Sequence, residues 1–470
     1  MIEDLKPYPE YKESGQEWLG QVPGHWDLKP GHAAFDKRKI PNKGLKENTV
    51  LSLSYGKIKV KPTEKLHGLV PESYETYQIV DEGDIIIRGT DLQNDKTSLR
   101  IGLSRNRGII SSAYLCLHCR DTVIPEYGYQ ILNAFDLTKA IYRYGSGLRQ
   151  NLDHGEIKRL PIFLPPPAEQ AAIVRFLDHW SGRLEKVIRA KRRVIGLLQE
   201  QKQAIIHRAV TRGLDPNVKL KDSGVPWLGE IPEHWDIVRL KNACRIRGGF
   251  AFKTEWFQAE GIPVIRMSNL KRGVLDVSEA VRINPNQCVP GFELREGDIL
   301  YGLSGSVGST GSLGNFAVVS AADLPAQLNQ RVARFRPTNN ALECDFLVLL
   351  LQTSIFYEQV LADTTGTAQF NVSTNDVGRV AFALPSRSEQ RQIVTAIENA
   401  TEPLTTAISR YEREISLLRE YRTRLTADVV TGKVDVRAAA AQLPELGRDP
   451  VATEAEGLED EPEKGEAEEI

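Results

Sequence analysis

Cysteine is scarce in this sequence, and long apolar runs are missing. The 470 residues include only five cysteines, at positions 116, 119, 244, 288 and 344. Their odd number and irregular spacing favour reduced thiols over a disulfide framework. No stretch of about eighteen apolar residues occurs, which argues against a transmembrane helix, and the first residues lack the layout of a signal peptide. We therefore expect a cytoplasmic protein without a membrane partner.

Net charge is nearly absent as well. The chain has 60 Lys and Arg against 62 Asp and Glu, a formal charge of −2, which by itself argues against a nucleic-acid partner. The charge is unevenly spread, however. Residues 445–470 hold eleven acids and two basic residues, a net −9, which leaves +7 for residues 1–444. The segment 438–470 is therefore predicted to be a disordered acidic tail on a mildly basic body.

Catalytic and cofactor motifs are also lacking. The sequence contains no G-x-G-x-x-G, no G-x-x-x-x-G-K-[ST], no G-x-S-x-G and no [ND]-P-P-Y run. Cys116 and Cys119 have zinc-knuckle spacing but no second pair, and residues three apart on a strand face opposite sides, so buried core thiols are favoured over a metal site. We predict no catalytic, cofactor-binding or metal-binding residue, and hence a chain that is not an enzyme.

An internal repeat organises the chain. Residues 11–30 (YKESGQEWLGQVPGHWDLKP) return at 220–239 as LKDSGVPWLGEIPEHWDIVR, with ten of twenty positions identical. Glu82-Gly83-Asp84-Ile85 recurs 214 residues later, and Glu169-Gln170 recurs 220 residues later. The growing offset indicates loop insertions on a common scaffold.

Each copy of the repeat has two parts. The first is rich in β-branched stretches broken by Gly, Pro, Asn and Asp, which predicts mixed α/β domains over residues 1–165 and 215–386. The second has narrow apolar stripes at helical spacing, which predicts long helices over 166–214 and 387–437. Neither helix can bury its stripe alone, so the helix of the other copy is the expected partner.

These motifs resemble the specificity subunit of type I restriction-modification systems. The resemblance is carried by the two S-G-x-x-W-L-G-x-[VI]-P-x-H-W-D segments, by the L-P-x-x-x-E-Q-x-x-I-V helix openings, and by the helix endings Val210-Thr211 with Gly213 and Val430-Thr431-Gly432. It extends from about residue 8 to about residue 437, in the same order and twice over.

The resemblance implies an α+β fold with two target-recognition domains, each reading one part of a split DNA site, and two long helices packed antiparallel as a coiled coil. It also implies partners: double-stranded DNA, two methyltransferase subunits docked on the helices, and motor-nuclease subunits. S-adenosylmethionine, ATP and magnesium would then belong to the partners, and no cofactor to this chain. Two repeated domains in one chain would create an internal pseudo-twofold axis.

The spacer helix and the divergent loops predict features of the DNA site. A helix over 168–212 would be about 65 Å long at roughly 1.5 Å per residue, a stiff element able to set the gap between half-sites. Between the shared motifs the two copies are dissimilar, so the two halves should recognise different sequences in an asymmetric site.

Lys and Arg suit phosphates, whereas Arg, Asn and Gln suit base edges. DNA-binding candidates in the first domain are Arg88, Asn94, Lys96, Arg100, Arg105, Arg107, Arg149, Gln150 and Asn151. Those in the second domain are Arg245, Arg247, Lys253, Arg266, Asn269, Lys271, Arg272, Gln327, Asn329, Gln330, Arg331, Gln369 and Asn371. A basic run at Lys37-Arg38-Lys39, with Lys57, Lys59 and Lys61 at strand spacing, is a further candidate backbone contact. A solvated surface charge is the alternative for each of them.

The repeated Trp18, Trp26, Trp227 and Trp235 lie in the shared segments, which favours packing against the helices over base stacking. His25 and His234 are expected to make a structural hydrogen bond. One alternative function stays open for the whole chain: a tandem coiled-coil scaffold that binds proteins without DNA specificity.

Overall fold

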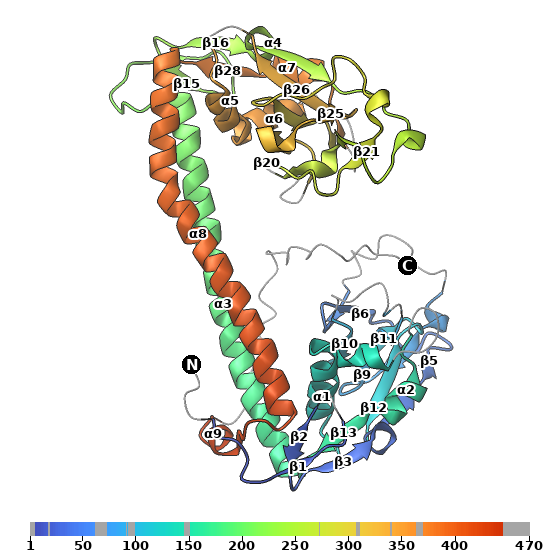
Figure 1. Cartoon of the computed structure of the whole chain (residues 1–470). Helices are drawn as coiled ribbons and strands as arrows, with labels where there is room; N and C mark the ends of the chain where they lie inside the picture. The colour runs from blue at the N-terminus through green and yellow to red at the C-terminus, as the bar shows by residue number, and fades with distance from the viewer. Residues whose placement is uncertain are drawn as a thin grey trace. The chain divides into compact units, whose positions relative to one another are not determined.

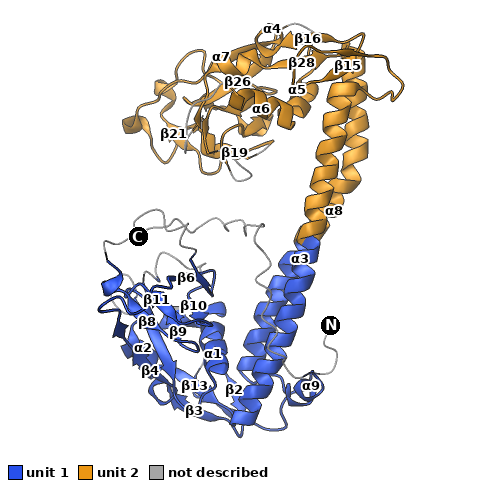
Figure 2. Ribbon diagram, turned by 180° about the vertical axis from the view of Figure 1, so that it is seen from behind, with its two compact units in different colours: residues 1–191, 413–470 blue, residues 192–412 orange. Residues whose placement is uncertain are grey.

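The computed structural model describes residues 5–16, 19–61, 73–90, 92, 99–144, 151–271, 273–306, 311–338, 341–362 and 370–444. The chain divides into two compact units (Figure 2). Unit 1 combines residues 1–191 with 413–470, and unit 2 comprises residues 192–412. Each unit therefore joins one α+β domain to the segments of the two long helices that belong to it.

The two long helices are α3 (Pro167–Arg212) and α8 (Arg387–Val430) (Figure 1). Both begin where the sequence predicts, because prolines end the preceding strands at Leu164 and Leu384 and α3 has proline at its first position. Both end before a glycine in the left-handed region: Gly213 has φ 71° and Gly432 has φ 75°. Such a residue closes a helix at little steric cost, which explains the repeated Val-Thr…Gly endings.

Within each unit the two helices run antiparallel. In unit 1 Glu185 pairs with Arg422 at 3.1 Å, and Lys191, further along α3, pairs with Glu414, earlier in α8. In unit 2 Lys202 Nζ donates to Thr405 Oγ1 at 3.0 Å. These partly exposed polar contacts set the register, and they add little stability in water.

Unit 1 is built on a four-stranded antiparallel sheet ordered β10-β9-β12-β4 and a three-stranded sheet ordered β11-β8-β5. The strand bounds are β4 (Phe35–Arg38), β5 (Ile40–Pro41), β8 (Gln78–Val80), β9 (Ile85–Ile87), β10 (Ile101–Leu103), β11 (Gly108–Ile110) and β12 (Leu115–Cys119). Three antiparallel pairs join β1 (Tyr11–Glu13) to β2 (Gln21–Pro23), β3 (Asp27–Pro30) to β13 (Pro161–Leu164), and β6 (Leu51–Ser54) to β7 (Lys57–Val60). The shorter helices are α1 (Pro125–Leu137), α2 (His154–Arg159) and α9 (Arg437–Ala441).

Unit 2 repeats this plan. Its four-stranded antiparallel sheet is ordered β17-β26-β22-β24, and its three-stranded sheet β21-β18-β25 contains one parallel pair, β18 with β25. The strand bounds are β17 (Cys244–Gly248), β18 (Ile262–Ile265), β21 (Val281–Ile283), β22 (Ile299–Gly302), β24 (Phe316–Val318), β25 (Gln327–Leu328) and β26 (Val332–Pro337).

The remaining strand pairs of unit 2 are β14 (Leu220–Asp222) with β15 (Glu230–Pro232), β16 (Asp236–Arg239) with β28 (Ala381–Leu384), β19 (Leu270–Lys271) with β20 (Val274–Leu275), and β23 (Ser304–Gly305) with β27 (Phe370–Asn371). Its shorter helices are α4 (Leu240–Ala243), α5 (Cys344–Leu351), α6 (Ser354–Ala362) and α7 (Thr374–Arg379).

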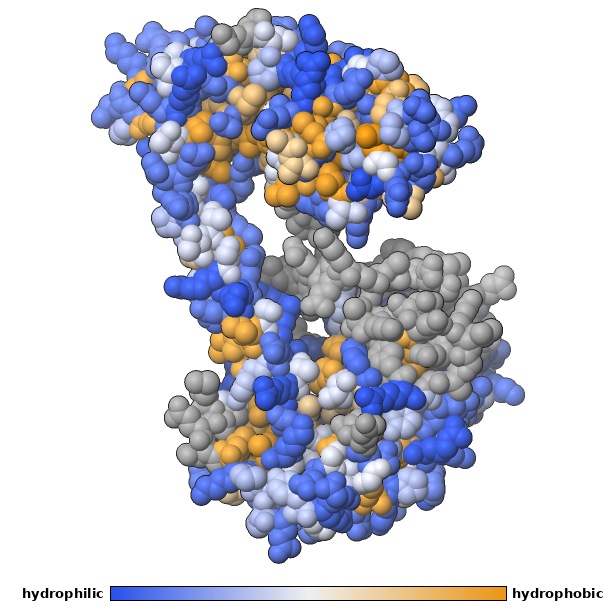
Figure 3. Space-filling model, viewed as in Figure 1, coloured by the Kyte–Doolittle hydropathy of each residue, from blue (hydrophilic) through white to orange (hydrophobic). Residues whose placement is uncertain are grey.

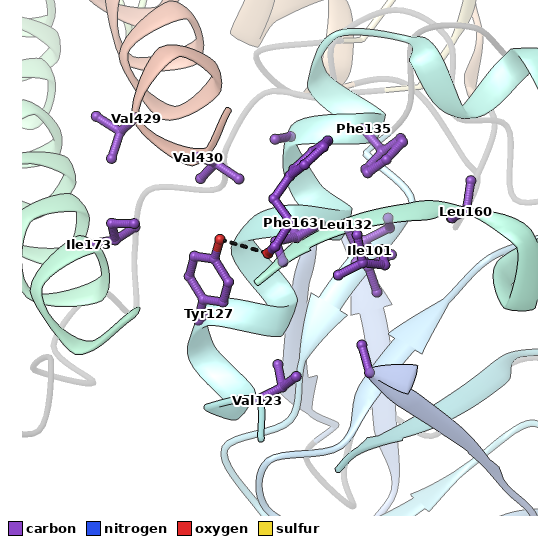
Figure 4. Packing of buried hydrophobic residues seen from close by; sticks show 14 of the residues in the cluster. Ile101, Val123, Tyr127, Leu132, Phe135, Leu160, Phe163, Ile173, Val429 and Val430 are labelled. Atoms are coloured by element: carbon purple, nitrogen blue, oxygen red, sulfur yellow. Dashed lines mark hydrogen bonds between the residues drawn. The ribbon is translucent and has the colours of Figure 1, made fainter. Parts of the chain in front are cut away.

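The core of unit 1 joins the domain to the long helices. Tyr127 of α1 is buried and donates to the Phe163 carbonyl at 3.0 Å, and the same cluster includes Ile173 of α3 with Val429 and Val430 of α8 (Figure 4). In unit 2, Ile206 of α3 and Ile393 of α8 belong to the core formed around β22 and β26. Each domain therefore uses the helices as part of its own core.

Cys116 and Cys119 lie on β12, as predicted, and on its two faces. Cys116 packs with Ile86 and Val80, whereas Cys119 packs with Phe35 and Val123. Burial raises the pKa of both thiols, that of Cys119 to about 12. Among the described residues no group of three or more His, Cys, Asp or Glu side chains could hold a metal ion.

Apolar side chains are not confined to the cores. Figure 3 shows a mainly hydrophilic surface on the face in view, with apolar side chains interspersed. Exposed apolar residues on the long helices are Val187, Val194, Leu197 and Leu417. None of the described helices alone is long and apolar enough to cross a membrane, and α5 with α6 passes that test only as a pair bent by 69°.

Candidate nucleic-acid interface

In unit 1 a buried carboxylate holds the domain on the start of α3. Glu169, in the first helical turn, accepts from Tyr8 Oη at 2.7 Å and Trp26 Nε1 at 2.9 Å, and its other oxygen lies 2.7 Å from His25 Nε2. Trp26 is buried and lies against Gly432, at the end of α8. The first turn of α3 is also a favourable place for a negative charge.

The second copy keeps the residues but not all of the contacts. Glu389 lies 3.2 Å from His234 Nε2, and Trp235 is buried beside Gly213 at the end of α3. The Trp235 Nε1 atom is buried without a hydrogen-bond partner. The predicted structural hydrogen bonds of His25 and His234 are thus confirmed, as is the packing of Trp26 and Trp235 against the helices.

The glutamine of each Glu-Gln pair ties the helix start to the domain. Gln170 accepts from Ile124 N at 3.0 Å and donates to the carbonyls of Thr122 and Pro165. Gln390 accepts from Glu343 N at 2.8 Å and donates to Ala341 and Pro385 in the same way. Both side chains are buried and fully bonded, which fixes each domain rigidly on its helix.

The repeated Glu-Gly-Asp motif builds a tight turn before the central strand. Asp84 accepts from Asp81 N at 2.9 Å, and Asp298 accepts from Arg295 N at 2.8 Å. Each carboxylate also contacts a basic side chain on the neighbouring strand: His118 Nδ1 lies 2.9 Å from Asp84, and Arg336 Nη2 donates to Asp298 at 2.7 Å. The turn directs β9 and β22 toward an equivalent edge in the two units.

In unit 2 that edge gathers polar side chains from three segments. Leu303 N donates to the Arg331 carbonyl and Val372 N to the Leu303 carbonyl, both at 2.8 Å, while Ser304 pairs with Asn371. Gln330, Arg331 and Asn371 are exposed. Arg331 has φ 68°, a left-handed conformation that non-glycine residues rarely adopt and that is typical of functional sites. We define the reading edge of unit 2 as Ser304, Gln330, Arg331 and Asn371.

Unit 1 has the matching edge. Leu152 N donates to the Gly89 carbonyl at 2.7 Å, as Val372 does to Leu303, and a Cβ on Gly89 would lie 2.0 Å from the Leu152 carbonyl oxygen. Asn151, which precedes Leu152 as Asn371 precedes Val372, is exposed. An exposed Asn side-chain amide can form two hydrogen bonds with the edge of one adenine base.

The chain is similar to known proteins. Residues 232–417 match the type I restriction modification DNA specificity domain. The chain is 26% identical over 366 residues, 76% of this chain and 81% of the relative, to the MjaVIII specificity subunit of Methanocaldococcus jannaschii. It is 29% identical over 204 residues to the EcoAI specificity subunit of Escherichia coli, a match that covers 43% of this chain and only 34% of that relative.

A solved structure supports the fold. A chain from a study of complex assembly and conformational transition of the type I restriction-modification system aligns with a TM-score of 0.60 and 17% identity, over 87% of this chain and 98% of that one. The family model and the MjaVIII relative support a specificity subunit of a type I restriction-modification system.

The structure leaves many of the predicted DNA-binding residues accessible. Exposed candidates are Arg105, Arg107, Asn151, Arg245, Arg247, Lys253, Lys271, Gln330, Arg331 and Asn371, and half-buried ones are Arg88 and Arg266. Arg107 is also engaged by Asp81 at 2.6 Å and Glu47 at 3.4 Å. Lys57 and Lys59 lie on β7, as their spacing predicts, and Lys61 follows its last residue, whereas Arg38 turns inward to Asp81 and Asp84.

Four candidates have internal roles, and these correct the sequence-based predictions. Arg100 is fully buried, and its guanidinium donates to the carbonyls of Arg88 and Thr90. Asn269 bridges Arg266 N and the Asp276 carbonyl. Gln327 accepts from Val289 N, and Asn329 is only 8% exposed. The side chains of Arg100, Asn269 and Gln327 hydrogen-bond to backbone groups that would otherwise lack a partner, which explains their burial.

Several predicted residues lie outside the described part of the chain: Asn94, Lys96, Arg149, Gln150, Arg272, Gln369, Trp18 and residues 445–470 of the predicted tail. The prediction that disorder begins at residue 438 is wrong, because α9 packs Ala440 into the core of unit 1. The packing prediction does not hold for Trp227, which is 45% exposed. Sequence reasoning missed Ser304, Arg334 and Arg336. The alternation Arg334-x-Arg336 within a strand could have revealed the last two, since residues two apart share a face.

Proposed function

We propose that this chain is the sequence-specific DNA-recognition subunit of a type I restriction-modification complex. The observation that carries the proposal is the pair of equivalent edges, at Asn151 and at Asn371, built on one scaffold, in which unit 1 has Gly89 and Thr90 where unit 2 has Leu303 and Ser304. Two similar frames with different side chains would read two different sequences. The target is thus a split, asymmetric site on double-stranded DNA.

The long helices are proposed to serve two further purposes. They form an antiparallel coiled coil with pseudo-twofold symmetry, which sets the spacing between the half-sites, and they dock two methyltransferase subunits. Support comes from the antiparallel contacts within each unit and from the apolar residues left exposed on α3 and α8. Motor-nuclease subunits would join the complex for restriction.

We assign the methylation and cleavage reactions to the partner subunits. S-adenosylmethionine, ATP and magnesium are expected on the methyltransferase and motor-nuclease subunits, and this chain contributes recognition without catalysis. Because its proposed substrate is chromosomal DNA, we expect it to act in the cytoplasm.

A methylation map of host DNA, made with and without this gene, tests the proposal. Loss of one split, asymmetric motif on deletion is the expected result, and it would identify the target at the same time. An unchanged map, in a host that expresses the chain with its methyltransferase, would instead favour the protein scaffold without DNA specificity.

A further inference from the structure

One face of the sheet in unit 2 brings four arginines together. β17 and β26 pair so that Arg245 lies opposite Arg336 and Arg247 lies opposite Arg334. Side chains two apart on a strand share a face, so all four guanidinium groups emerge on the same side of these two strands. Like charges placed directly opposite each other destabilise a sheet.

Only two of the four arginines have hydrogen-bonding or ionic partners within unit 2 that offset the like-charge repulsion. Arg336 is bound by Asp298, and buried Arg334 donates to the Glu293 carbonyl at 2.7 Å. Burial, and then the charges of Arg336, Arg247 and Arg295, lower the pKa of Arg334. Arg245 and Arg247 are exposed, and within the described residues no carboxylate pairs with either; Arg247 rests on the Phe292 ring at 4.3 Å.

The first copy of the repeat shows that the scaffold does not require this arrangement. At the equivalent positions of unit 1, Arg38 lies opposite Cys116 and Asp36 opposite His118. There Arg38 binds Asp81 and Asp84, and Asp36 binds Arg120 at 2.7 Å. Charges are balanced in unit 1, so the arginine excess is particular to unit 2.

We propose that Arg245 and Arg247 bind the phosphodiester backbone of the DNA whose bases are read at the edge of unit 2. β26 starts directly after Arg331, so Arg334 and Arg336, with their cross-strand partners, lie about 10 to 17 Å from the reading edge at roughly 3.3 Å per residue. That distance is within half of the roughly 34 Å helical turn of duplex DNA. The phosphates supply the negative charge that the arginine pairs lack. This inference rests on the proposed function and adds a site to it.

The salt dependence of DNA binding tests the site. Each phosphate contact contributes about 0.9 to the slope of log K against log salt, so R245Q/R247Q in the full chain should lower the slope by about 1.8. The loss should be equal on a target duplex and on a duplex of arbitrary sequence, because phosphates carry no sequence information. R245K/R247K, which keeps both charges, should retain the slope. K219Q/K221Q is the matched control: it removes two exposed charges, one on β14 and one just before it, and should leave the salt slope unchanged.

Thermal unfolding without DNA provides a second measurement. R245Q removes a like charge opposite Arg336 and spares the contact of Arg247 with Phe292, so its Tm at low salt should equal or exceed that of the wild type. A lower Tm would mean that Arg245 holds the fold, and would overturn the assignment. An unchanged slope in R245Q/R247Q, while the wild type still prefers its target, would also overturn it and leave the proposed function standing. A wild-type chain without site preference would overturn both.

Discussion

At the scale of the residue, identical side chains in the two copies have different surroundings. Glu169 is 5% exposed and receives three donors, whereas Glu389 is 24% exposed and contacts only His234 among its described side-chain neighbours. The difference has a local cause: Tyr8 donates to Glu169, and Arg437, which is paired with Asp435, lies over the Tyr8 ring at 5.2 Å. The two copies therefore share the same residue types, but these residues contribute differently to the stability of each unit.

This asymmetry gives a matched pair of variants. Glu169→Ala should lower the free energy of unfolding by about 3 kcal/mol, because it leaves the buried Tyr8 hydroxyl and Trp26 indole N–H without an acceptor. Glu389→Ala should cost about 1 kcal/mol or less, because its partner His234 is exposed. Denaturant unfolding of both variants checks the difference. Equal losses would show that the three hydrogen bonds of Glu169 do not stabilise the junction.

At the scale of the element, the starts of the long helices are fixed more tightly than their middles. The start of α8 is held by Gln390 and by Glu343, which binds Arg387 and, at 2.7 Å, Arg391. Toward the middle, the described polar contacts are Lys191 with Glu414 and Lys202 with Thr405, which are partly exposed. The helix ends therefore anchor the domains, and the middle serves mainly to connect them.

The Glu343 contacts predict a pH dependence. Hydrogen bonds from Arg387, and then from Arg391, hold the pKa of Glu343 below its ordinary value of 4.5. The stabilisation is fully present above about pH 4.5 and is lost as the pH falls through the lower, folded-state pKa. Tm should thus fall more steeply below pH 4.5 in the wild type than in Glu343→Gln. Glu398→Gln, the same change at an exposed position of α8, is the control; if Glu343→Gln shows the wild-type slope, the contacts do not couple to folding.

At the scale of the whole molecule, one chain carries two recognition units of common topology and different surface chemistry. Unit 2 has the reading edge with Arg331 and an arginine-rich sheet face, while unit 1 has balanced charges at the equivalent strands. Duplication preserves the scaffold because its core residues are buried, and it frees the exposed positions to diverge.

The proposed spacer can be tested by shortening both helices together. Removing residues 199–202 from α3 and 405–408 from α8 takes out about one turn from each and keeps the antiparallel register indicated by the Lys202–Thr405 contact. The methylated site should then have a shorter gap between its half-sites, or the complex should fail to assemble. A methylation map with the original gap in an assembled complex would contradict the role of the helices as a ruler.

The sequence by itself determined the repeat, the α+β character and the two long helices with their starts; α3 ends near the predicted boundary at residue 214, whereas α8 ends at Val430, before the predicted boundary at residue 437. These features depend on local signals: apolar spacing, prolines before each helix and glycine after it. It also placed His25, Trp26 and their repeats in structural roles, because they lie in the shared segments.

Only the tertiary structure decided which polar residues remain available to DNA. Arg100 and Asn269 have the same side-chain chemistry as the accessible candidates, yet they donate hydrogen bonds to the backbone carbonyls of Thr90 and Asp276. The opposition of Arg245 and Arg247 to Arg336 and Arg334 depends on strand register between segments some ninety residues apart. Composition and periodicity describe a residue's own segment, whereas burial and cross-strand pairing depend on which other segment lies beside it.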